Sequence, residues 1–132
     1  MKKLFFLILL FAGISNNLAI AQVSDQKVSN VKPIEFSKLL DSTEKRTLVD
    51  VRTAKEVATG KIVSSIHIDY YRSDFKEALS VLDKDIPIFV YCRSGVRSGR
   101  TANILKSLGF KEIYNLSGGI RSWKGKELPI EE

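Results

Sequence analysis

Short runs of apolar residues alternate along the chain with segments in which apolar residues recur every three or four positions. The runs at residues 47–51 and 87–92 are rich in branched and aromatic side chains, which predicts two buried strands. Residues 110–115 predict a further strand, and the alternating run at 66–68 predicts a short one. Strands that alternate with helices favour an α/β fold in which helices cover both faces of a parallel central sheet.

The predicted helices have recognisable starts and stops. Thr53 and Glu56 have the spacing of a capping box, and Gly60 is expected to end the short helix that they begin. A longer helix is predicted over residues 101–108, where Gly109 follows as a left-handed stop. The remaining helices are predicted over residues 34–40, over 73–82 with Ser73 as the N-cap, and from Gly119 onward with Trp123 packed in the core.

The N-terminus has the pattern of an exported protein. Lys2 and Lys3 precede a short apolar run, and Ala19 and Ala21 supply small residues at the positions that determine cleavage. We therefore expect residues 1–21 to be a cleavable signal peptide, which makes the protein periplasmic or secreted without a stable membrane anchor. Retention of this segment as an uncleaved anchor is the alternative. We expect a flexible lead-in over residues 22–32, whose last residues join the sheet edge. One domain is predicted over residues 33–132, and its last residues, 128–132, are expected to form a loose tail.

Charge limits the partners of the chain. The formal net charge is +6, and removal of residues 1–21 leaves 19 basic and 15 acidic side chains. This mild excess favours small anions or an acidic partner, but it does not reach the density expected of a nucleic-acid-binding protein. With one cysteine and one histidine, the sequence indicates no internal disulfide, no metal site and no cofactor.

The cysteine occupies a position with clear chemical consequences. Cys92 ends the predicted strand at 87–92 and is followed by a basic, glycine-containing loop that leads to a helix. Free N–H groups at a helix start, together with the guanidinium groups of Arg93, Arg97 and Arg100, favour the thiolate over the thiol. Cys92 is therefore the candidate nucleophile.

Other polar residues gather at the same predicted edge of the sheet. Asp50 and Arg52 lie at the carboxyl end of the strand at 47–51, which is where ligands bind in open α/β sheets. Glu56 lies one turn further and is expected to pair with Arg52. We interpret Asp50, Arg52 and Glu56 as supporting residues that hold the floor of the Cys92 loop, and His67 as a packing or hydrogen-bonding residue.

Three motifs in this order resemble the rhodanese family of sulfurtransferases. The first runs from Leu48 to Ile62, the second is the loop from Tyr91 to Ser98, and the third runs from Tyr114 to Trp123. The resemblance implies a rhodanese-like fold and a sulfur atom carried on Cys92 as a persulfide. It also implies a set of substrate-binding residues in the loop, namely Arg93, Ser94, Gly95, Val96 and Arg97.

The chain departs from the family pattern in one region. Gly60-Lys61 stands where the family has a glycine-histidine pair, Ser64-Ser65 where it has a glycine-alanine pair, and His67 where it has an asparagine. These differences bear on the shape of the loop and of the substrate rim.

The expected reaction is transfer of sulfane sulfur from a small anionic donor, such as thiosulfate, to a thiol or cyanide acceptor. A reducing thiol protein is a further expected partner, because an exported, accessible thiol is open to overoxidation. A non-catalytic sulfur carrier or partner-binding module is the alternative. A phosphatase or arsenate reductase is a weaker one, since their loops place five residues between cysteine and arginine, whereas four separate Cys92 from Arg97.

Overall fold

The computed structural model describes residues 25–132, so the predicted signal peptide lies outside the described residues. The elements are β1 (Lys27–Val31), α1 (Pro33–Ser42), β2 (Thr47–Asp50), α2 (Ala54–Val57), β3 (Lys61–Ile62), β4 (Ile66–His67), α3 (Phe75–Ser80), β5 (Ile88–Tyr91), α4 (Val96–Ser107), β6 (Glu112–Leu116), α5 (Gly119–Gly125) and β7 (Ile130–Glu131).

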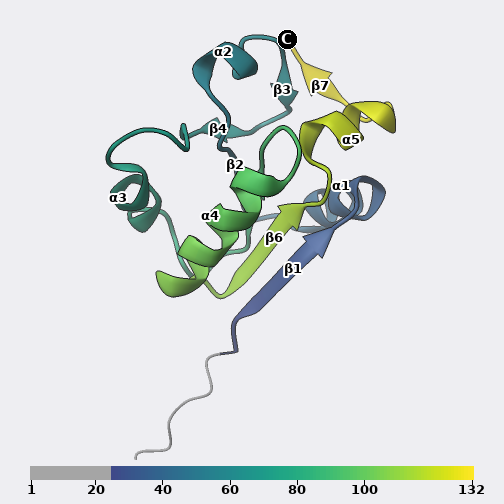
Figure 1. Cartoon of the computed structure of the whole chain (residues 1–132). Helices are drawn as coiled ribbons and strands as arrows, with labels where there is room; N and C mark the ends of the chain where they lie inside the picture. The colour runs from purple at the N-terminus through teal and green to yellow at the C-terminus, as the bar shows by residue number, and fades with distance from the viewer. Residues whose placement is uncertain (1–24) are drawn as a thin grey trace, which may run out of the picture.

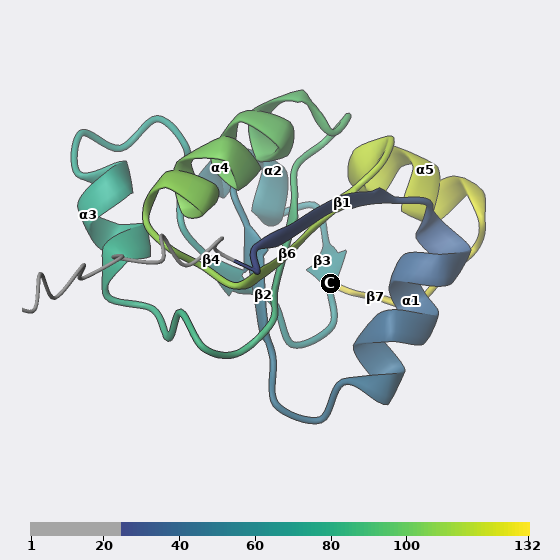
Figure 2. The same ribbon diagram turned by 90° about the horizontal axis from the view of Figure 1, so that it is seen from below.

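Five strands form a parallel sheet in the order β1-β6-β5-β2-β4. Strand β5 lies at its centre and is buried along its whole length. Helices α3 and α4 pack on one face, and α1 and α5 pack on the other, as Figures 1 and 2 show. The predicted α/β fold is therefore confirmed.

Each face of the sheet has its own apolar core. Val90 and Cys92 point toward the core beneath α3 and α4, whereas Phe89 and Tyr91 point toward the core beneath α1 and α5. This alternation follows from the two-residue period of a strand. Trp123 packs edge-on against Phe36 and is almost fully buried, as predicted.

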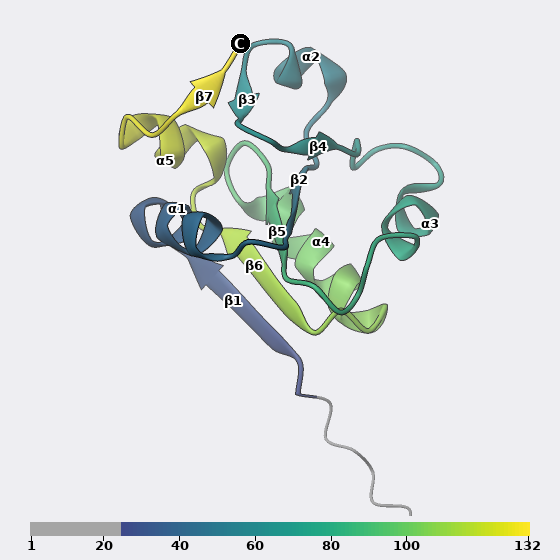
Figure 3. The ribbon, with the colours of Figure 1, turned by 180° about the vertical axis from the view of Figure 1, so that it is seen from behind.

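Two segments at the ends of the domain contain strands where the sequence predicted a flexible lead-in and a loose tail. Strand β1 pairs with β6 along Lys27–Val31, so only the expectation that the lead-in reaches the sheet edge is confirmed, not its flexibility. The predicted loose tail contains β7, which pairs with β3 in a separate antiparallel sheet. Figure 3 shows β7 and β3 side by side next to α2.

Two helices begin or end away from their predicted positions. Helix α4 starts at Val96 instead of residue 101, so the second half of the reactive loop forms its first turn. Helix α3 is shorter than predicted and follows Asp74, with no capping by Ser73. Thr53 does cap α2 by accepting the N–H of Glu56, and Gly109 adopts the predicted left-handed conformation. Within residues 25–132, no helix is long and apolar enough to cross a membrane.

Candidate active site

Cys92 lies at the carboxyl end of the central strand β5, with no exposed surface. Its Sγ accepts a hydrogen bond from the backbone N–H of Gly95 at 3.1 Å and another from the hydroxyl of Ser98 at 3.3 Å. Gly95 precedes α4 with a φ of 98°, a conformation that glycine adopts without steric cost. The loop thus curls around the sulfur atom.

These hydrogen bonds change the acidity of the thiol. Burial acts to raise the pKa of Cys92, but the Ser98 hydroxyl and the N–H groups of Ser98, Gly95 and Ser94 outweigh burial and lower the pKa below its ordinary value. A reactive thiolate was predicted from the sequence, with the arginines as a main cause. The predicted N–H groups do contribute, and the leading cause that lowers the pKa is the Ser98 hydroxyl, which the sequence interpretation missed.

The start of helix α5 holds the loop from the other side. The N–H of Ile120 donates to the carbonyl of Cys92 at 2.9 Å, and the N–H of Arg121 donates to the carbonyl of Arg93 at 3.1 Å. Gly119 has a φ of 62°, and a Cβ there would lie 2.6 Å from the carbonyl oxygen of Cys92 and closer still to that of Arg93. This close approach requires glycine, so Gly119 positions the loop.

Arg97 forms an ion pair that the sequence did not indicate. Its guanidinium donates to both carboxylate oxygens of Glu56, at 2.8 and 3.0 Å. Burial acts to lower the pKa of Arg97, but the hydrogen bond and charge of Glu56 raise it, and the charge of Cys92 adds to this effect. Arg97 also lies over the ring of Tyr71, 5.8 Å from its centroid. Glu56 therefore links helix α2 to the reactive loop instead of forming the predicted ion pair with Arg52.

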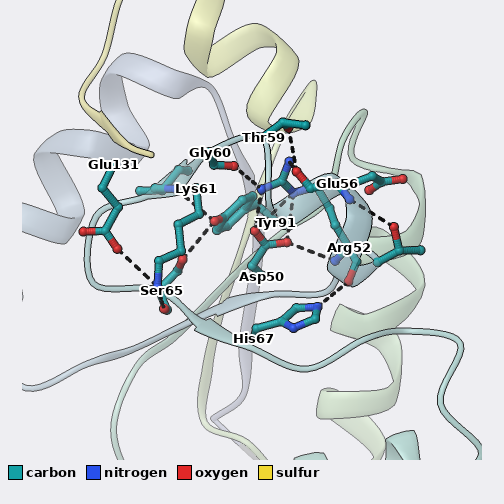
Figure 4. A network of polar contacts seen from close by, with 12 residues as sticks. Asp50, Arg52, Glu56, Thr59, Gly60, Lys61, Ser65, His67, Tyr91 and Glu131 are labelled. Carbon is teal, nitrogen blue, oxygen red and sulfur yellow. Dashed lines mark hydrogen bonds and ion pairs between the residues drawn. The ribbon is translucent and has the colours of Figure 1, made fainter.

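Arg52 is paired with Asp50 in a buried network (Figure 4). Its Nε and one terminal nitrogen contact the Asp50 carboxylate at 3.0 and 2.7 Å, and the same terminal nitrogen donates to the carbonyl of Gly60 at 2.7 Å. Burial acts to lower the pKa of Arg52, whereas Asp50 raises it. The pair ties strand β2 to the segment before β3.

Tyr91 and His67 complete this network. The Tyr91 hydroxyl accepts the N–H of Ile62 at 3.0 Å and lies 3.0 Å from the Ser65 hydroxyl. Burial and the charge of Asp50 raise the pKa of Tyr91, so its hydroxyl stays protonated. His67 Nε2 lies 2.7 Å from the carbonyl oxygen of Arg52, which makes it a hydrogen-bonding residue.

The remaining predicted site residues lie around the mouth of the loop. Arg93, Ser94 and Val96 are exposed, and Arg93 lines a pocket beside the loop. Arg100 is exposed on α4. Residues 25–132 contain no group of three or more histidine, cysteine or acidic side chains that could hold a metal ion.

Comparison with known proteins identifies a family with this fold. A profile of the rhodanese-like domain family matches residues 32–126. The chain belongs to the rhodanese-like family. The structure of a rhodanese-related protein from Thermoplasma volcanium aligns with a TM-score of 0.67 at 27% identity, covering 77% of this chain and 96% of that one.

Two relatives of this rhodanese-like domain have names that describe an activity. A sulfurtransferase of Allochromatium vinosum is 34% identical over 103 residues, which cover 78% of this chain and 94% of that protein. A thiosulfate sulfurtransferase of Glaesserella parasuis is 33% identical over 88 residues, which cover 67% of this chain and 80% of that protein. The rhodanese-like domain is thus similar to proteins that are named as sulfurtransferases, and it places the buried sulfur atom of Cys92 within its reactive loop.

Proposed function

We propose that this protein is an exported sulfurtransferase that carries sulfane sulfur on Cys92 between a small anionic donor and a thiol or cyanide acceptor. The observation that carries the proposal is the convergence of the Gly95 N–H and the Ser98 hydroxyl on Sγ. Hydrogen-bond donors fixed around a sulfur atom stabilise its anion without reorganisation during the reaction. The thiosulfate sulfurtransferase among the relatives supports thiosulfate as a donor.

The first half of the proposed reaction loads sulfur onto the enzyme. The Cys92 thiolate attacks the sulfane sulfur of thiosulfate, a bond forms between the two sulfur atoms, and the bond to the sulfonate sulfur breaks with release of sulfite. The product is Cys92 persulfide, and the negative charge moves to the outer sulfur atom. The N–H groups of Ser94, Gly95 and Ser98 remain available to this anion at the start of α4.

The second half regenerates the thiolate. An acceptor thiolate attacks the outer sulfur, the S–S bond to Cys92 breaks, and the acceptor leaves as its own persulfide. Cyanide accepts the sulfur in the same way and leaves as thiocyanate. Glu56 holds Arg97 at the loop, where the guanidinium can donate hydrogen bonds to an incoming anion. A phosphatase is disfavoured because the loop is one residue shorter than phosphatases require.

Intact mass spectrometry tests the proposal. The purified protein should gain the mass of one sulfur atom after exposure to thiosulfate and lose it on addition of excess thiol. Cys92→Ser should show no gain. No gain with either thiosulfate or mercaptopyruvate would contradict the proposal.

The same mass measurement tests export. Protein exported from cells that express the full chain should begin at Gln22, whereas a species that retains residue 1 would contradict cleavage.

A further inference from the structure

A basic pocket of ≈ 500 Å³ lies beside the reactive loop, between α2 and the start of α5. It is lined by the carboxylate of Glu56 and by five cationic side chains, namely Arg52, Lys55, Arg93, Arg121 and Lys124. The pocket adjoins the reactive loop because Arg93, which lines it, follows Cys92 directly and its carbonyl accepts the N–H of Arg121. A ligand in this basic pocket would therefore lie next to the loop that holds the sulfur.

Most of the positive charge in the basic pocket is not balanced by the protein. Arg52 is paired with Asp50, and the carboxylate of Glu56 is paired with Arg97. The other four cations, Lys55, Arg93, Arg121 and Lys124, are exposed and form no ion pair within residues 25–132. Like charges that converge from three segments of the chain create a local field that attracts anions.

The size of the basic pocket distinguishes its ligand from thiosulfate. Each molecule in liquid water occupies about 30 Å³, so the pocket has the volume of roughly seventeen water molecules, whereas thiosulfate has five heavy atoms. Volumes of about 300–1,000 Å³ are typical of pockets for small organic ligands. A protein partner would instead need a contact area of roughly 800 Å² on each side. Volume and charge together favour an organic polyanion.

We propose that the basic pocket binds the carboxylates of the sulfur acceptor, a small organic thiol that carries at least two of them. This inference rests on the proposed persulfide chemistry. Lys55, Arg121 and Lys124 hold the carboxylates, and Arg93, the residue after Cys92, lines the same pocket. The acceptor thiolate attacks the outer sulfur of Cys92 persulfide, the S–S bond breaks, and the acceptor persulfide leaves with no net oxidation or reduction.

The test compares two acceptors with thiosulfate as the common donor. Glutathione carries two carboxylates and serves as the anionic probe, whereas mercaptoethanol carries none. The double variant Lys55→Gln/Lys124→Gln should lower kcat/KM for glutathione about tenfold, since each exposed charge pair contributes roughly threefold. The rate with mercaptoethanol should stay within about twofold of that of the unmodified protein, because its binding involves no charge pair.

A matched control removes the same charge elsewhere. Lys38 and Lys126 are exposed lysines that line a different pocket near α1, so Lys38→Gln/Lys126→Gln changes the net charge equally. This control should leave the rate with glutathione unchanged. An equal loss with both thiols, an equal loss in the control, or no loss at all would overturn the inference. No loss together with a normal rate of sulfur loading would point to an acidic protein as the partner.

A binding measurement separates failure of this inference from failure of the proposed function. S-methylglutathione cannot accept sulfur, yet it retains both carboxylates. In the unmodified protein it should shift the backbone NMR signals of residues 55, 59 and 124, and in the double variant the signals of the same three positions should not move. If binding occurs but Cys92 takes up no sulfur, the proposed function fails while the ligand class of the basic pocket is supported. If sulfur loads but no signal shifts, the inference fails alone.

Discussion

The hydroxyl of Ser98 offers a sharp test of how the fold makes Cys92 reactive. Ser98 is fully buried, and its hydroxyl lies 3.3 Å from Sγ. A hydrogen bond to an ionised group contributes about 1.5–3 kcal/mol. Sulfur is a weak acceptor and the distance is long, so we take the lower end, about 1.5 kcal/mol, which corresponds to roughly a tenfold change in an equilibrium. Ser98→Ala should therefore leave about a tenfold smaller fraction of thiolate at low pH.

The rate of reaction with a neutral disulfide reagent across pH is the appropriate assay. A more basic thiolate is intrinsically more nucleophilic, with a Brønsted coefficient of about 0.4–0.5, which offsets the loss by roughly threefold. Ser98→Ala should thus react about threefold more slowly at low pH and about threefold faster at the high-pH plateau. The two rate profiles should cross, which a change in accessibility alone would not produce.

A second serine on the same helix provides the control. Ser107 is exposed, and its hydroxyl donates to the carbonyl of Ile104, far from the sulfur along α4. Ser107→Ala should reproduce the profile of the unmodified protein. If Ser98→Ala lowers the rate at every pH, raises it at every pH, or leaves it unchanged, then the hydroxyl does not stabilise the thiolate and our account of the lowered pKa is wrong.

Two further substitutions test backbone conformation. Gly119→Ala should abolish sulfur loading in the mass assay, because the added methyl overlaps the loop carbonyls, and normal loading would refute the role of Gly119 in positioning the loop. Gly109 has a φ of 92° with nothing within 4 Å of an added Cβ, so the control Gly109→Ala should keep loading and lower the free energy of unfolding by about 1 kcal/mol. Ser64→Gly should raise the free energy of unfolding in urea by about 0.5–1 kcal/mol, since Ser64 has a φ of 68°, and a decrease would show that no strain is relieved there.

The sequence predicted the elements whose signals are local. The two central strands follow from continuous apolar runs, and the Thr53 cap follows from hydroxyl chemistry within one turn. The start of α4 was not predicted, because its N-cap is Gly95, which has no side chain that could cap the helix and so mark its beginning in the sequence. Its first turn is also mostly polar, so apolar periodicity begins only after the helix has started.

Long-range partners were harder to predict. Glu56 has Arg52 four residues away, and local spacing favoured that pair, but the fold brings Arg97, 41 residues away, within 2.8 Å. Arg52 instead meets Asp50 because the end of β2 is buried and a buried guanidinium requires a charged partner. Strand β1 is largely polar and β7 has only two residues, so their pairing depends on distant segments that no local pattern reveals.

The contacts between α5 and the Cys92 loop also have a consequence for the newly made chain. Strand β1 pairs with β6, and Asn30 and Asn115, 85 residues apart, are joined by a hydrogen bond. Until residues 112–121 have been synthesised, neither β6 nor the N–H groups of Ile120 and Arg121 can hold the loop. During translation, Cys92 should therefore react as an ordinary cysteine, and its chemistry should mature only when folding is complete.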